Sequence, residues 1–361
     1  MVSIRALTTA LITLLVTGVM SLPGWALPIS SGDRLRIFVP ADDELPEGDR
    51  LQLSGVYEIN LDGNLLFPFV TPIAASGLEA EEIEQRLRNS LIENGFFRDD
   101  RFQISVQVLQ WAPVQVTVAG EVFNPGRVLI NTLPLTDRDG RPRPRAQELI
   151  NTTGEAPSER FLSAAIRSVG GLKPNADIRN IRLIRGKQEQ IIDLSGAFTG
   201  EPVDDVPLIA GDQVIVPQLE TPQIALVRPS QLTPNEIPVI MSNLSEPARR
   251  GSQILTMPYG TRLSQVVVAA NCAGGNKVTN AKRRVSLVQT DRLTGQTRVS
   301  DYAVERLLRT ASRNSENPFL MPQDSVVCYD STVSTASGVL GFVSDIFAPF
   351  FLIQRLFENN D

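Results

Sequence analysis

The side chains that most often carry out catalysis are scarce in this sequence. It has no histidine, which excludes Ser–His and Cys–His catalysis and most metal sites, and it has no glycine-rich phosphate loop. The acidic pairs Asp42–Asp43 and Asp204–Asp205 could supply the two carboxylates of a glycoside hydrolase. Adjacent acidic residues in polar turns are more often simply solvated. We therefore predict a protein that is not an enzyme and has no cofactor or metal, with carbohydrate hydrolysis as an alternative.

The two cysteines, Cys272 and Cys328, are the remaining candidates for specific chemistry. Their wide spacing and the lack of histidine argue against a zinc site. In an oxidising compartment they could form a disulfide, and both fall in one predicted module. Two buried free thiols are the alternative.

The C-terminal segment 331–361 has the pattern of an amphipathic membrane helix. Residues 331–354 carry one charge, Asp345, and a helix of this length would extend about 36 Å, enough to cross a bilayer. Small and polar residues fall on one side of this helix and large apolar residues on the other. The residues predicted to line a water-filled pore are Ser334, Ser337, Gly338, Gly341, Ser344 and Asp345. The residues predicted to face lipid are Val339, Leu340, Val343, Ile346, Phe347 and Phe350. A helix packed on its own domain would show the same pattern.

Residues 1–26 have the features of a secretory signal peptide. Arg5 precedes a short apolar stretch, and small residues stand before a predicted cleavage point after Ala26. An uncleaved anchor is the alternative, although the apolar run is short for a membrane span. No cysteine lies near the cleavage point, so we do not expect a lipid-modified N-terminus.

Composition agrees with an exported, folded protein. Apolar residues make up 42% of the chain, and the formal net charge is −6, which argues against a nucleic-acid partner. Glycine and proline are frequent, as expected for short strands and turns. Arg141, Arg143 and Arg145 could meet an anionic polymer, but they lie in a polar segment that also fits a solvated loop.

Hydrophobic alternation and turn residues divide the rest of the chain into three units. The N-terminal domain, residues 27–113, has strands after Gly32–Asp33 and around the Asp62–Gly63 turn, then a helix opening at Gly77. The first module, residues 114–219, has strands, a helix at Leu162 and a loop insertion at residues 130–161.

A second module, residues 239–330, repeats the order of the first after a proline-containing linker, residues 220–238. The helix at Leu263 corresponds to the helix at Leu162. The turn and strand from Met321 to Val327 correspond to those from Ala210 to Val216. Such tandem repeats are more typical of binding or scaffold modules than of active sites.

The N-terminal domain resembles that of the outer-membrane polysaccharide export family, on Gly32–Asp33, Leu53–Tyr57, Asp62–Pro68 and Gly77–Leu78. The first module resembles the soluble-ligand-binding (SLBB) β-grasp module of that family, on the motifs Gly120–Val122, Pro125–Gly126, Gly170–Leu172 and Gly211–Pro217. The resemblance implies an α+β chain: a polysaccharide export N-terminal domain, two β-grasp-like modules and a C-terminal amphipathic transmembrane helix. Three departures are the missing N-terminal cysteine, the insertion at residues 130–161 and a degenerate second module, in which Gln323 replaces Gly211.

The resemblance also implies a function and partners. The chain would form a ring-shaped homo-oligomer that exports capsular or extracellular polysaccharide, with its bulk in the periplasm and its C-terminal helices forming a pore in the cell outer membrane. An inner-membrane co-polymerase that regulates chain length is the implied protein partner. The alternative is a soluble periplasmic polysaccharide-binding or scaffold protein of the envelope.

Overall fold

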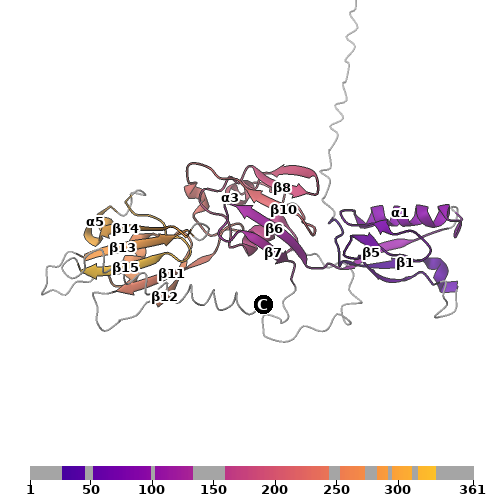
Figure 1. Cartoon of the computed structure of the whole chain (residues 1–361), viewed down its shortest axis with the longest axis horizontal. Coiled ribbons are helices and arrows are strands. Elements are labelled where there is room, and N and C mark those ends of the chain that lie inside the picture. The colour runs from indigo at the N-terminus through magenta and orange to yellow at the C-terminus, as the bar shows by residue number, and fades with distance from the viewer. Residues whose placement is uncertain are drawn as a thin grey trace, which may run out of the picture.

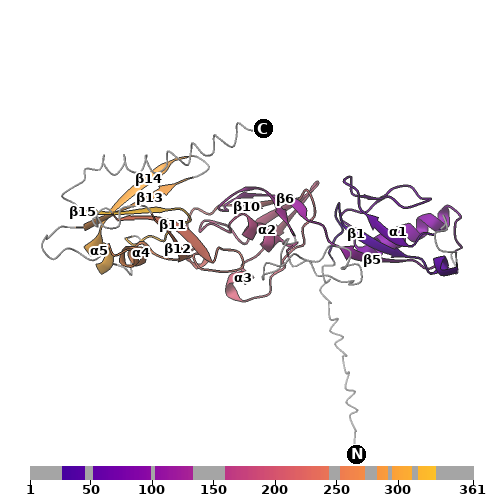
Figure 2. The ribbon, with the colours of Figure 1, turned by 90° about the horizontal axis from the view of Figure 1, so that it is seen from below.

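Three folded units follow one another along the long axis of the chain (Figures 1 and 2). The structure is a computed structural model. It describes residues 27–44, 52–98, 102–132, 159–243, 253–272, 283–291, 295–310 and 316–330. The described elements form a mixed α+β fold with four sheets and few helices. The predicted signal peptide and the predicted membrane helix lie outside the described residues.

The N-terminal domain is a three-stranded antiparallel sheet covered by one long helix. The sheet has the order β2-β1-β5, and β3 and β4 form a separate two-stranded sheet. The elements are β1 (Arg34–Phe38), a 3-10 helix (Pro40–Glu44), β2 (Gly55–Glu58), β3 (Asn64–Leu65), β4 (Ile73–Ala74), α1 (Ala80–Glu93) and β5 (Ser105–Gln110).

Helix α1 forms where the sequence pattern predicts one. Its apolar positions Ile83, Leu87 and Leu91 are fully buried against the sheet, as their spacing on one face requires. The Asp62–Gly63 turn is present, but the hairpin predicted around it is reduced to one bridge between Ile59 and Leu65. The reason is that β2 pairs with β1, and β3 pairs with β4 instead.

The first module is a five-stranded mixed sheet with the order β7-β6-β10-β8-β9. The central strand β10 runs parallel to β6 and antiparallel to β8. Helix α2 buries Leu162, Ala165 and Ile166 in the core of this sheet. The elements are β6 (Val114–Gly120), β7 (Gly126–Ile130), α2 (Leu162–Ser168), β8 (Ile181–Arg185), β9 (Gln188–Ile192), α3 (Gly196–Thr199) and β10 (Gln213–Val216).

The second module has the same topology, with the order β12-β11-β15-β13-β14. Its central strand β15 runs parallel to β11 and antiparallel to β13. A disulfide joins Cys272, after α4, to Cys328 on β15, with their Cα atoms 6.0 Å apart. The elements are β11 (Glu236–Asn243), β12 (Gln253–Pro258), α4 (Leu263–Ala269), β13 (Arg283–Thr290), β14 (Thr297–Ala303), α5 (Val304–Arg309) and β15 (Ser325–Asp330).

The segment predicted as a linker is shorter and more buried than its composition indicates. Strand β11 begins at Glu236, so residues 236–238 belong to the second module. Before it, a 3-10 helix (Ile224–Leu226) places Leu226 in the core of the first module together with Leu232, and Val227 belongs to the core of the second. The linker is therefore packed against both modules because its apolar side chains have cores to enter.

Strands β6 and β10 approach each other closely at Gly120, and two other glycines of the first module, Gly126 and Gly211, serve as controls. Gly120 has φ +89°, and a Cβ there would lie 1.9 Å from the Val216 carbonyl oxygen. Gly211 has the same φ but open space, and Gly126 has open space without a positive φ. We expect Gly126→Ala to leave the thermal unfolding midpoint unchanged or slightly higher. Gly211→Ala should cost about 1–2 kcal/mol for backbone strain, and Gly120→Ala clearly more. Equal losses for the last two would contradict the close approach.

Candidate functional site: the interdomain junction

The residues predicted to line the pore and to face lipid all belong to segment 331–361, which lies outside the described residues. None of the helices in the described part of the chain has the length and apolar character that crossing a bilayer requires. The predicted pore therefore stays a prediction. The two cysteines are the predicted site residues that the structure does describe, and it brings them together in the disulfide of the second module.

In each acidic pair considered for hydrolysis, one carboxylate accepts hydrogen bonds that hold nearby backbone in place. Asp42 is buried, and its carboxylate accepts hydrogen bonds from the backbone N–H groups of Leu53 and Ser54. Asp205 accepts hydrogen bonds from the N–H and the hydroxyl of Ser163, at the start of α2. These carboxylates hold local backbone in place, which accounts for an acidic residue at both positions.

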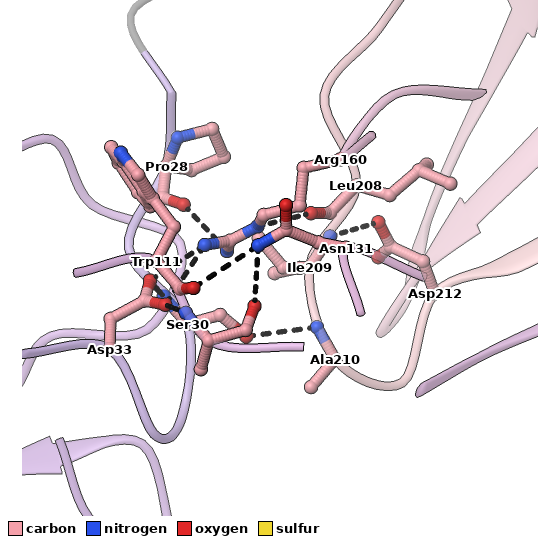
Figure 3. A network of polar contacts seen from close by, with 11 residues as sticks. Pro28, Ser30, Asp33, Trp111, Asn131, Arg160, Leu208, Ile209, Ala210 and Asp212 are labelled. Atoms are coloured by element: carbon pink, nitrogen blue, oxygen red, sulfur yellow. Dashed lines mark hydrogen bonds and ion pairs between the residues drawn. The ribbon is translucent and has the colours of Figure 1, made fainter. Parts of the chain in front are cut away.

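The described residue cluster with the most unusual chemistry lies between the N-terminal domain and the first module (Figure 3). It is centred on Arg160, which precedes α2, and on Asp33, which precedes β1. Both side chains are fully buried. Charged side chains are almost never buried without a partner, and here each of the two charges has the other as its partner.

Asp33 is placed by the turn that starts β1. Its Oδ2 accepts a hydrogen bond from Ser30 N–H at 2.7 Å, and Gly32 in the turn has φ +86°. Its Oδ1 accepts a hydrogen bond from Ala112 N–H at 2.7 Å, where the chain leaves β5 for the first module. The carboxylate thus ties together the two ends of the N-terminal domain.

Arg160 uses its guanidinium to join the two units. Its Nη1 lies 2.9 Å from both carboxylate oxygens of Asp33. Its Nη2 donates to the carbonyl of Pro28 at 3.1 Å, and its Nε donates to the carbonyl of Leu208 at 3.3 Å. The guanidinium carbon also lies 4.9 Å from the centre of the Trp111 ring. The planar guanidinium presents five donors in a fixed fork and can reach acceptors on several sides, whereas a lysine has three donors on a single nitrogen.

The electrostatics of the pair reflect its burial. Loss of water raises the pKa of the Asp33 carboxyl, and the Arg160 charge and the N–H donors oppose this effect only in part. Removing one member of such a pair leaves an uncompensated buried charge, which usually costs more than the intact pair contributes. The pair therefore acts mainly to define one specific contact between the two units.

Further contacts close the junction around the pair (Figure 3). Asn131, with φ +58°, donates from Nδ2 to the carbonyls of Trp111 and Ala112. Ala210 N–H donates to the Ser30 hydroxyl at 3.0 Å. Asn131 and Arg160 stand at the two described ends of the 130–161 insertion, so both ends of that insertion are held at the junction.

The sequence pattern predicts the turn that carries Asp33, but it assigns neither Asp33 nor Arg160 to a site. The Gly32–Asp33 turn was expected to start a strand, and it does. Arg160 was assigned to the polar insertion because the segment has no hydrophobic period. The available signal was its place immediately before Phe161–Leu162, where the apolar pattern of the first module resumes. Trp111, between β5 and β6, packs against the Arg160 guanidinium.

Replacing Arg160 by methionine should destabilise the junction by about 3–5 kcal/mol, since Asp33 would remain buried without its charge partner. The matched control is Arg34→Met, which breaks the exposed pair with Glu58 and should cost less than about 1 kcal/mol. Denaturant unfolding and limited proteolysis between the two units would measure both. The double variant Asp33→Asn/Arg160→Met should lose less than the sum of the single variants. Similar losses for Arg160→Met and Arg34→Met would contradict this role.

Comparison with known proteins supports the resemblance of the N-terminal domain. No curated protein matches the chain. Residues 23–109, which include nearly all of the N-terminal domain, match the family model described as polysaccharide biosynthesis/export protein. The matched range contains Asp33 and ends just before Trp111 and Ala112, the first contacts on the way to the first module. The match identifies the N-terminal domain as a polysaccharide biosynthesis/export domain.

Proposed function

We propose that this chain is the subunit of an oligomeric outer-membrane channel that exports capsular or extracellular polysaccharide. The observation that carries the proposal is the family match of residues 23–109, since that family is one of polysaccharide export. The predicted signal peptide and the predicted amphipathic helix at 331–361 add an exported location and a means of crossing the membrane. The bulk of the chain would lie in the periplasm.

The architecture of the two modules supports a scaffold around a passage. We infer that both are β-grasp-like modules, because each has the same mixed order with a parallel central pair. Repeated modules stacked end to end suit a wall that many subunits build together. The packed linker supports the same proposal, since it limits movement of one module against the other.

Transport through such a channel requires little chemistry from the described residues. A polymer that slides through a wide aqueous passage needs weak polar contacts, whereas tight binding would hold it. One carboxylate of each acidic pair, that of Asp42 or Asp205, accepts hydrogen bonds from backbone N–H groups, and Asp205 also accepts one from a hydroxyl. We accordingly propose no enzymatic activity. The partners proposed are the polysaccharide, further copies of this chain in a ring, and an inner-membrane co-polymerase.

Truncation separates the channel from the alternative, a soluble periplasmic polysaccharide-binding or scaffold protein. The full chain should fractionate with the outer membrane and have the mass of a ring in detergent. A version that ends at Asp330 keeps all of β15 and should remain folded, soluble and outside the membrane. If both versions stay soluble and monomeric, the channel is wrong and the soluble alternative replaces it.

The orientation of the proposed pore helix can be tested separately. Gly341→Leu places a large side chain on the proposed pore-lining side and should reduce polysaccharide secretion while the protein still reaches the membrane. Val339→Leu makes a smaller change on the proposed lipid-facing side and should leave secretion near the wild-type level, because lipid accommodates either side chain. The measurement is the amount of polysaccharide secreted by cells that contain equal amounts of each variant. Equal secretion by both variants would contradict this orientation.

A further inference from the structure

Each of the three units has an aspartate that closes a turn before a strand. Asp33, Asp212 and Asp324 precede β1, β10 and β15, and each accepts a hydrogen bond from the backbone N–H three residues earlier. All three carboxylates are buried. What differs is the side chain that compensates the charge.

In the two modules, the compensating side chains occupy corresponding places in the sheet. Strand β8 pairs Ile184 with Gln213, and strand β13 pairs Val288 with Ser325. The next residue along is Arg185 in the first module and Gln289 in the second. Arg185 holds Asp212 with Nε at 3.0 Å and Nη2 at 2.7 Å. Gln289 reaches Asp324 with its neutral Nε2 at 3.0 Å.

Asp324 therefore has polar donors but no described cation beside it. The Met321 N–H and Gln289 Nε2 both donate to Oδ2, so a proton on Oδ1 would leave both hydrogen bonds intact. Burial raises the pKa of Asp324 to about 7, and these two donors oppose the rise only in part.

Other charged groups on this sheet are exposed or directed elsewhere. Arg298 lies opposite Gln289 in the register but is exposed, and Arg284 is paired with Asp301. Arg283 lies opposite Asp330, at the far end of β13 from Gln289. The charged residues on or directly after the strands of this sheet are Glu236, Arg283, Arg284, Asp291, Arg298, Asp301 and Asp330.

The Asp324 turn, residues 321–324, also connects strands. The Gln323 N–H donates to the Pro238 carbonyl, and the Asp324 carbonyl accepts from Ile240 N–H at 2.9 Å. Gln323 holds a left-handed φ of +69°, which is strained for a residue with a side chain. Strand β15 begins directly after this turn and ends where the predicted membrane helix begins.

We propose that the second module is pH-sensitive at the Asp324 turn, whereas the first module is locked by Arg185. With Asp324 protonated, the turn is closed against β13 and β11. With Asp324 ionised, a buried charge without a cation favours opening of the turn and of the start of β15. The module that leads into the predicted membrane helix thus loosens as the pH rises.

The sign follows from proton linkage. The unfolded carboxyl loses its proton near its ordinary pKa of 3.8, whereas the folded carboxyl keeps it until about pH 7. Between these values the folded module binds more protons than the open one, so its stability falls as pH rises and levels off above pH 7. One proton corresponds to at most roughly a tenfold change in the opening equilibrium per pH unit.

Hydrogen exchange of the full chain tests the proposal. Asp324→Asn mimics the neutral acid. We therefore compare the exchange rates of the β15 amides as a ratio, wild type divided by Asp324→Asn. This ratio cancels most of the pH dependence of intrinsic amide exchange. We expect this ratio to rise severalfold to tenfold per unit between pH 5 and 7. Gln289→Arg should remove the rise by supplying the missing cation. Arg185→Gln in the first module should create the same rise in β10.

Three results of these exchange measurements would contradict the proposed pH sensitivity. A ratio for β15 that stays constant from pH 5 to 8 would overturn it, and the Asp324→Asn comparison suffices for this even if another variant fails to fold. A rise that persists unchanged in Gln289→Arg would also overturn it, because the missing cation would then not be the cause. A flat profile for β10 in Arg185→Gln would show that the arginine is not what separates the two modules.

Discussion

The buried ion pair between Arg160 and Asp33 is the contact on which the arrangement of the N-terminal domain and the first module depends. Two charges without water are tolerated only where every polar atom around them is used. Here the carboxylate receives two backbone N–H groups and the guanidinium reaches two carbonyls besides. All of these hydrogen bonds can form together in only one relative placement of the two units. It therefore selects a geometry more than it adds stability.

The same turn with an aspartate recurs before β1, β10 and β15, and its surroundings change its role. Before β1 the aspartate is paired across a domain boundary, before β10 it is paired within the module, and before β15 it meets a neutral amide. The backbone of the turn is the same in each case, since the carboxylate accepts a hydrogen bond from the N–H three residues earlier. Whether the turn is an interdomain contact, a fixed closure or a titrating group is decided by the partner side chain.

For the proposed channel, these contacts would give a rigid periplasmic wall built from a small set of interactions. The ion pair would fix the N-terminal domain to the first module, and the packed linker would fix the first module to the second. A rigid wall fits a passage that a polymer crosses without being bound tightly. The family model covers the N-terminal domain, so the roles of the modules rest on their topology and on the contacts described above.

The sequence by itself determined the elements with a clear period and their order. The apolar positions of α1, the strands β8 and β10, and the correspondence of the two modules all follow from local pattern, because side chains facing a core must repeat with the period of their element. The tertiary structure decided the rest. It buried Arg160, which no period marks, because the partner Asp33 lies far away in the chain. It also packed the linker against two cores and paired Asp212 with a cation but Asp324 with an amide. Such contacts depend on which distant residues meet, and that is a property of the folded chain.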